Sequence, residues 1–210
     1  MSNSTLQRHT KHTIHHPSFF ALMGTLLYDL YTLCIVLPLF ILASILTALI
    51  TTIGCRLGNG HFWGYYPGKW WSWFTIRLLF LPVKVEGREH LDPKQSYVFV
   101  SNHQGAFDIF LIYGFLGRNF KWMMKRQLRN VPFVAIACQA AHHIFVDKRG
   151  PSKIRQTYEQ ARKTLKNGMS LVVFPEGART FTGHMVPFRR GAFMLADELQ
   201  LPVVPITING

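Results

Sequence analysis

One long apolar run near the N-terminus limits what this chain can fold into more than any other feature. Residues 31–53 carry no charged side chain, and about 20 such residues suffice for a helix to cross a bilayer. The run is too long, and begins too late, for a cleavable signal peptide. Asp29 is the one charge in residues 19–53, so a two-helix hairpin in one leaflet is the alternative to a full span, and Pro38 is a candidate kink. We therefore expect membrane insertion in one of these two forms.

Polar and aromatic segments flank the apolar run. Residues 1–18 are polar and rich in histidine, which predicts a titratable tail near the membrane, with a weak metal site as the alternative. Residues 54–69 predict a loop rich in glycine and aromatic side chains. Residues 70–81 predict an interfacial helix ended by a proline, because tryptophan prefers the headgroup level of a bilayer. Residues 19–82 thus form the expected membrane-anchoring and interfacial region.

The charge balance fits a membrane surface. The formal net charge is +13, although 49% of the residues are hydrophobic, and this combination favours anionic lipid as a partner. Nucleic acid is the other partner that a basic chain suggests, but we find no nucleic-acid motif and do not expect it. Residues 118–166 are the most basic stretch and predict a solvated face attracted to anionic headgroups. The three cysteines are far apart and give neither a disulfide framework nor paired metal spacing.

Beyond residue 82 the pattern changes to short apolar segments that alternate with helix-like ones. This alternation predicts an α/β domain over residues 83–210, with a mostly parallel or mixed sheet flanked by helices. Strands are expected at 83–87, 96–100, 170–174 and 203–208, and helices at 109–115, 152–166 and 191–199.

A short polar run follows the strand expected at 96–100. It contains Asn102, His103 and Asp108 and precedes a helix-like segment. In an α/β sheet, ligands bind at this end of the strands. A neutral imidazole can take a proton from a hydroxyl while a carboxylate orients the ring, so the run predicts general base catalysis. The alternative is a helix N-cap formed by Asn102 or Asp108.

A second polar turn, Phe-Pro-Glu-Gly-Ala-Arg-Thr at residues 174–180, follows another expected strand. Alone, it would predict a plain strand-to-helix connection. Together, the two runs resemble motifs of the glycerolipid acyltransferase family, of the 1-acylglycerol-3-phosphate acyltransferase type. The resemblance covers roughly residues 80–210. The first motif matches at Asn102, His103 and Asp108, the second matches with Ala178 in place of threonine, and residues 144–149 and 201–206 resemble two further blocks.

The resemblance implies a reaction. A fatty acyl group would pass from an acyl-CoA or acyl carrier protein thioester to the sn-2 hydroxyl of lysophosphatidic acid, giving phosphatidic acid, with no metal or other cofactor. His103 is implied as the base and Asp108 as the group that orients it. No Gly-x-Ser-x-Gly or cysteine nucleophile stands in a convincing place, so direct transfer is expected rather than an acyl-enzyme. His142 and His143 are not expected to share a metal, because adjacent residues of a strand face opposite ways.

The resemblance also implies a site for the substrate phosphate. Lys125 and Arg179 are expected to hold it, since arginine can form a bidentate pair and lysine adds a point charge. Gly177 is expected to allow close backbone approach, and Glu176 to bond the glycerol hydroxyl or position Arg179. The remaining binding candidates are Asn102 and Arg149.

Two alternatives remain at this stage. One is a sister acyltransferase for glycerol 3-phosphate, a lyso-ornithine lipid or another lysophospholipid. The other is a non-catalytic, basic membrane-binding protein. The expected location is a membrane, with the active site on the cytoplasmic face. Because the family usually continues for some tens of residues past its last block, the chain is expected to be either a short member or a truncated one.

Overall fold

The computed structural model describes residues 18–147, 149–165, 168–180 and 184–209. The histidine-rich tail predicted for residues 1–18 lies almost wholly outside them. The chain divides into two compact units, residues 1–38 and 39–210, which are treated separately below.

The apolar region is helical from Phe19 to Leu57, and this is the one helix among the described residues that is long and apolar enough to cross a membrane. It comprises α1 (Phe19–Tyr31), a π-helical turn (Thr32–Val36) and α2 (Leu37–Leu57). The helix runs through Asp29 without a break, so the alternative of a hairpin divided there is wrong. The π-helical turn lies directly before Pro38. Proline lacks an N–H group and crowds the preceding helical turn, and a wider turn relieves that clash.

The segment expected to be a loop is largely helical. α2 extends to Leu57, and α3 (Gly60–Trp63) and α4 (Tyr66–Leu78) follow at once. The prediction of a loop failed because the glycines allow close packing between helices. At Gly54 the Trp63 indole fills the space that a Cβ atom would need. In the second unit α4 packs on α2, where the Trp71 indole N–H donates to the Ser44 hydroxyl at 3.0 Å.

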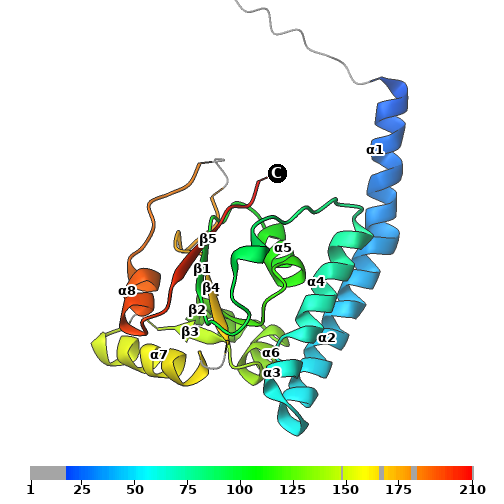
Figure 1. Cartoon of the computed structure of the whole chain (residues 1–210). Coiled ribbons are helices and arrows are strands. Elements are labelled where there is room, and N and C mark those ends of the chain that lie inside the picture. Colours follow the sequence, from blue (N-terminus) through cyan, green and yellow to red (C-terminus); the bar gives the residue numbers. More distant parts are fainter. Residues whose placement is uncertain (1–17, 148, 166–167, 181–183, 210) are drawn as a thin grey trace, which may run out of the picture. The chain divides into compact units, whose positions relative to one another are not determined.

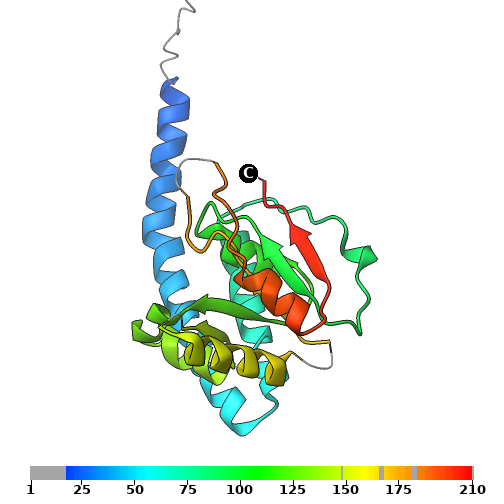
Figure 2. The ribbon, with the colours of Figure 1, turned by 90° about the vertical axis from the view of Figure 1, so that its left-hand side faces the viewer.

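The α/β domain contains one five-stranded parallel sheet in the order β3-β2-β4-β1-β5, which confirms the predicted fold class. β5 (red in Figure 2) forms one edge of the sheet. The central neighbours β1 and β4 are far apart in sequence, and their pairing brings the two predicted motifs together. The strands are β1 (Val98–Ser101), β2 (Phe120–Lys125), β3 (Ile144–Val146), β4 (Ser170–Val173) and β5 (Val203–Ile206).

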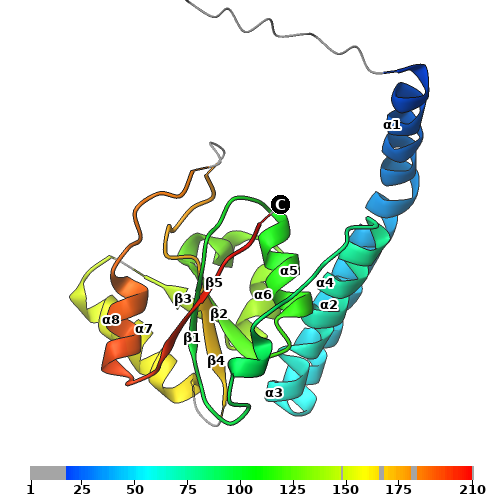
Figure 3. The ribbon, with the colours of Figure 1, turned by 45° about the horizontal axis from the view of Figure 1, so that its top comes forward.

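Helices cover both faces of this sheet (Figures 1 and 3). Alternate residues of the central strands divide the core: Val98 and Leu171 pack in a cluster with residues of α7 and α8, whereas Phe99 packs with residues of α5. This alternation follows from the period of two in a β-strand. The remaining helices are α5 (Phe107–Phe115), α6 (Val134–Ala140), α7 (Pro151–Thr164) and α8 (Gly191–Glu198).

The strand predicted at residues 83–87 is wrong, because this segment is not in the sheet. Its alternation is real: Val83 and Val85 are half-buried, whereas Lys84 and Glu86 are exposed and form an ion pair. One-sided burial on the surface therefore produced a strand-like pattern without a partner strand.

Candidate active site

The predicted base and carboxylate lie side by side beyond the end of β1. His103 Nδ1 is 2.9 Å from Asp108 Oδ2, and the two side chains are only 12% and 8% exposed. Since a carboxylate can only accept, Nδ1 carries the hydrogen and Nε2 is left as the basic nitrogen. The N-cap position of α5 is Ala106, with no side-chain cap, so neither Asn102 nor Asp108 serves as a cap.

Asp108 is held as a carboxylate by three donors. Its Oδ2 atom also accepts hydrogen bonds from the backbone N–H groups of Gln104, at 2.7 Å, and Gly105, at 2.9 Å. Burial alone would raise the pKa of Asp108, but the hydrogen bonds from the His103 ring and from these backbone groups outweigh it and lower the pKa below its ordinary value. A charged carboxylate at this point stabilises the imidazolium that forms when His103 takes a proton.

The turn after β4 holds His103 at three points. The Phe174 ring stacks on the His103 ring, with centroids 3.8 Å apart and planes 12° from parallel. Glu176 Oε1 accepts the His103 backbone N–H at 2.7 Å, and the Thr180 N–H donates to the His103 carbonyl at 3.2 Å. The ring and both backbone polar groups of the base are therefore fixed by a segment that the sequence places far away.

Glu176 links this turn to a third segment. Its side chain is almost completely buried, and its second oxygen accepts the Val186 N–H at 3.0 Å. Backbone donors thus engage both carboxylate oxygens, which favours a positioning role over the alternative of a bond to the substrate.

Gly177 has φ +78°, a conformation that favours glycine. The Arg189 side chain lies over it, with Nε 2.9 Å from the position that a Cβ atom would take. The backbone N–H of Arg189 also donates to the Pro175 carbonyl at 2.9 Å. Sequence reasoning missed Arg189, for which the only signal is a basic pair, Arg189-Arg190, after the second motif.

Asn102 is engaged by the backbone of a distant residue. Its amide N–H donates to the Ile208 carbonyl at 2.9 Å, and its amide oxygen accepts the Ile208 N–H at 2.8 Å. This reciprocal pair extends the contact between β1 and β5 beyond the last paired residues. A structural clamp therefore accounts for the Asn102 side chain, and its role in substrate binding stays a prediction.

The predicted phosphate-binding residues are exposed. Lys125 ends β2, and Arg179 lies beside Thr180 in the second motif. Arg149 follows β3 and donates to Asp147 at 2.9 Å, and Arg126 lies 3.4 Å from the same carboxylate. The hydrogen bonds from Arg149, with the charges of Arg149 and Arg126, lower the pKa of Asp147 to about 2. Because all five strands are parallel, these cations follow strands that end at the same edge of the sheet as the base.

Among the described residues no cluster of three or more His, Cys, Asp or Glu side chains could hold a metal. His142 is exposed, whereas His143 is buried and its Nδ1 accepts a hydrogen bond from the backbone N–H of Trp122 at 3.2 Å. Burial lowers the pKa of His143 to about 3, so this ring is a neutral part of the core.

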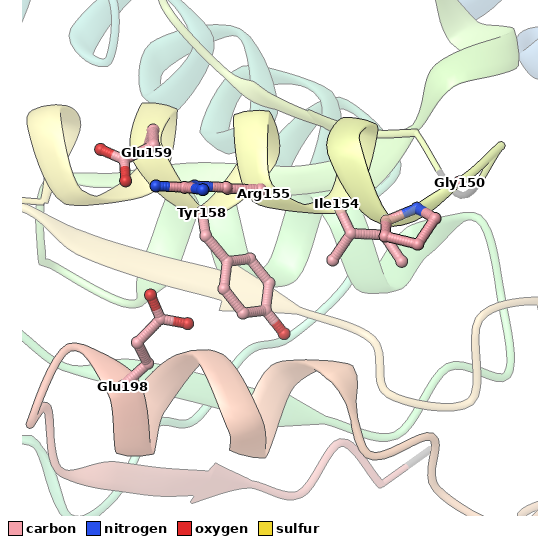
Figure 4. Close-up of a pocket in the computed structure, with 7 residues that line it drawn as sticks. Gly150, Ile154, Arg155, Tyr158, Glu159 and Glu198 are labelled. Carbon is pink, nitrogen blue, oxygen red and sulfur yellow. The ribbon is translucent and has the colours of Figure 1, made fainter.

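A groove of about 670 Å³ lies elsewhere, between α7 and α8 (Figure 4). Tyr158 projects from α7 toward α8, and Ile154 is 41% exposed in the groove. None of the residues of the two motifs lines the groove, so it is separate from the His–Asp pair.

A paired base and carboxylate, at the same carboxyl edge of a parallel sheet as several exposed cations, suit an enzyme that activates a hydroxyl group of an anionic substrate. Residues 82–209 match the family model described as Acyltransferase, and the chain therefore belongs to the acyltransferase family.

Relatives carry a more specific name. The chain is 40% identical over 136 residues to human 1-acyl-sn-glycerol-3-phosphate acyltransferase alpha. This alignment covers 64% of this chain and 48% of the human protein. It is 31% identical over 201 residues to the Saccharomyces cerevisiae 1-acyl-sn-glycerol-3-phosphate acyltransferase, and this alignment covers 90% of this chain and 63% of the yeast protein. The crystal structure of the Thermotoga maritima acyltransferase PlsC superposes with a TM-score of 0.67 at 25% identity. The superposition covers 88% of this chain and 73% of the PlsC chain. The chain spans about half the length of most of the curated relatives it matches.

Proposed function

We propose that this protein is a membrane-bound acyltransferase that moves a fatty acyl group from a thioester to the sn-2 hydroxyl of 1-acylglycerol 3-phosphate, giving phosphatidic acid. The observation that carries the proposal is the buried His103–Asp108 pair, fixed by the second motif of the same family. The names of the relatives support the choice of acceptor.

In this reaction His103 Nε2 takes the proton of the acceptor hydroxyl as its oxygen attacks the thioester carbonyl carbon. The new C–O bond forms and the C–S bond breaks, and the proton passes from the imidazolium to the leaving thiolate. Asp108 stabilises the imidazolium, and its hydrogen bonds from the backbone keep it charged throughout. The scheme uses the acyl thioester, on CoA or acyl carrier protein, as co-substrate and needs no further cofactor.

Arg179 and Lys125 bind the acceptor phosphate in this proposal, and Arg149 is a further candidate once a ligand competes with Asp147. The helix Phe19–Leu57 anchors the protein in the membrane. The basic α/β domain suits the anionic surface of the cytoplasmic leaflet, and we therefore assign the active site to that face.

A sister acyltransferase is the second candidate. Its motivation is Ala178, an exposed residue of the second motif where the family motif has threonine. The loss of that hydroxyl removes one possible polar contact to the acceptor headgroup and leaves the His–Asp pair untouched.

The test uses the purified chain in lipid vesicles with lysophosphatidic acid and radiolabelled acyl donors, acyl-CoA and acyl carrier protein thioester in parallel. We expect labelled phosphatidic acid from the wild type and at least about 100-fold slower formation from His103→Ala. Glycerol 3-phosphate, a lyso-ornithine lipid and lysophosphatidylcholine serve as competing acceptors. Faster acylation of one of these would replace the proposed acceptor, and equal rates for wild type and His103→Ala would contradict the mechanism.

A further inference from the structure

The segment after the second motif is fastened to it at two points. The backbone N–H of Val186 donates to the buried Glu176 carboxylate, and the backbone N–H of Arg189 donates to the Pro175 carbonyl. The backbone that carries the Arg189 side chain is thus tied to the turn that holds His103.

The Arg189 guanidinium lies against the backbone of this turn. Its Nε and Cζ atoms are 2.9 and 3.1 Å from the position that a Cβ atom of Gly177 would occupy. Two independent features therefore favour glycine at residue 177: its φ angle is positive, and a Cβ atom would collide with the Arg189 side chain.

Among the described residues, no side chain pairs with the charge of Arg189. Within the described part of the chain, its guanidinium makes no hydrogen bond or ion pair, and the residue is exposed. The acidic residue of the turn at 174–180, Glu176, already accepts two backbone N–H groups. Arg149, by contrast, is paired with Asp147.

We propose that Arg189 binds a phosphate group of a substrate, on the same turn as Arg179. The inference rests on the proposed function and adds a residue that the recognised motifs do not include. A guanidinium presents several N–H donors in a fixed plane and can form two parallel hydrogen bonds with one phosphate. The phosphate belongs either to the acceptor headgroup or to the CoA part of the donor, and the two sources share this chemistry.

The kinetic test compares Arg189→Gln with Arg190→Gln, its exposed neighbour at the start of α8. Loss of a charged hydrogen bond should raise the KM for the phosphate-bearing substrate about tenfold or more, with kcat little changed. The KM of Arg189→Lys should fall between those of the wild type and Arg189→Gln, because an ammonium group keeps the charge but cannot form two parallel hydrogen bonds with one phosphate. Arg190→Gln should match the wild type.

Two arms separate the sources of the phosphate. A rise confined to the KM of short-chain lysophosphatidic acid assigns the acceptor headgroup. A rise confined to the KM of acyl-CoA, absent with an acyl-pantetheine donor that lacks the nucleotide phosphates, assigns the donor. If neither constant changes, or if kcat alone falls, Arg189 has only a structural role in the turn and the proposal is overturned.

A binding measurement keeps this inference distinguishable from the proposed function. In the His103→Ala background, calorimetric titration with short-chain lysophosphatidic acid, with CoA and with the matching monoacylglycerol reports binding without turnover. Weaker binding of a phosphate-bearing probe after Arg189→Gln supports the site even if the wild type proves inactive. Unchanged binding of both phosphate-bearing probes overturns the site even if the wild type is an active transferase.

Discussion

The segments after β1 and β4 differ sharply from those after β2 and β3, although all four follow parallel strands at one edge of the sheet. After β1 and β4, the side chains of His103, Asp108 and Glu176 are nearly buried and hydrogen-bonded within the site. After β2 and β3, Lys125 and Arg149 are exposed, and Arg149 contacts an acid of its own segment. The His103 side chain is therefore fixed by folding, whereas in the proposed function the exposed cations form their phosphate interactions only when the substrate binds.

This difference predicts how variants should divide. Changes to the buried side chains after β1 and β4, those of His103, Asp108 and Glu176, should lower kcat, because the base must already be aligned when the substrate arrives. Changes among the exposed cations should raise KM, because their interactions form on binding. The predictions below run from the largest expected effect to the smallest.

His103→Ala should reduce turnover by about 10²- to 10⁴-fold, the usual contribution of a general base. Asp108→Asn should be nearly as damaging, because it removes the carboxylate that orients the ring and stabilises its charge. Binding of lysophosphatidic acid, measured by titration, should persist in both variants. Wild-type turnover in His103→Ala would show that the buried segments do not hold the base.

Glu176→Gln tests whether the positioning of His103 matters in its own right. A glutamine can accept one of the two backbone N–H groups but must set its NH₂ group against the other. We expect kcat to fall by about tenfold and KM to change little, given roughly 1.5 kcal/mol for a hydrogen bond to a charged group. A change in acceptor KM alone would instead show that Glu176 contacts the glycerol hydroxyl.

Arg179→Lys and Lys125→Ala should each raise the KM for lysophosphatidic acid about tenfold, if both residues bind its phosphate. The KM for the acyl donor should change little. Lys163→Ala, on the exposed side of α7, is the control: it should weaken attachment to anionic vesicles at low salt and leave headgroup selection unchanged. Kinetics on soluble short-chain substrate separate the effect on KM from the effect on vesicle attachment. If an Arg179 variant behaves like Lys163→Ala, the assignment of Arg179 to the phosphate site is wrong.

Arg149→Ala should have the smallest effect, because exposed ion pairs contribute little to stability. The pKa of Asp147 is lowered to about 2 in the folded protein, below an unfolded value of about 4. Any stabilisation from this pair is therefore fully present above about pH 4 and disappears as the pH falls toward about 2. Thermal melts of wild type and Arg149→Ala across this range provide the measurement, and a difference that grows on acidification would contradict the assignment.

The sequence predicted the features that depend on local spacing. The offset of five positions from His103 to Asp108, at a junction of strand and helix, sufficed to place the two side chains together. The parallel α/β fold followed from apolar segments that alternate with amphipathic ones. The loop expected at residues 54–69 failed because its glycines permit close packing of Trp63 rather than chain flexibility.

The rest of the site depends on contacts between distant residues. Nothing in the sequence around Glu176 indicates that its oxygens bind the backbones of His103 and Val186. The placement of Arg189 over Gly177 depends on how the chain folds between β4 and α8. The stacking of Phe174 on His103 requires the order of strands in the sheet, in which β4 lies beside β1. Composition and periodicity do not specify that order.

The pairing of Asn102 with Ile208 has a consequence for the timing of synthesis. Asn102 is buried and adjoins the base, but its amide partners lie 106 residues further along the chain. A ribosome therefore completes the helix Phe19–Leu57 long before it adds the segment that satisfies this amide. Until that segment docks, the residue beside His103 keeps two unpaired polar groups, which would cost free energy if they were buried. The Asn102 amide can thus be satisfied only after residue 208 has been added, well after the apolar helix is complete.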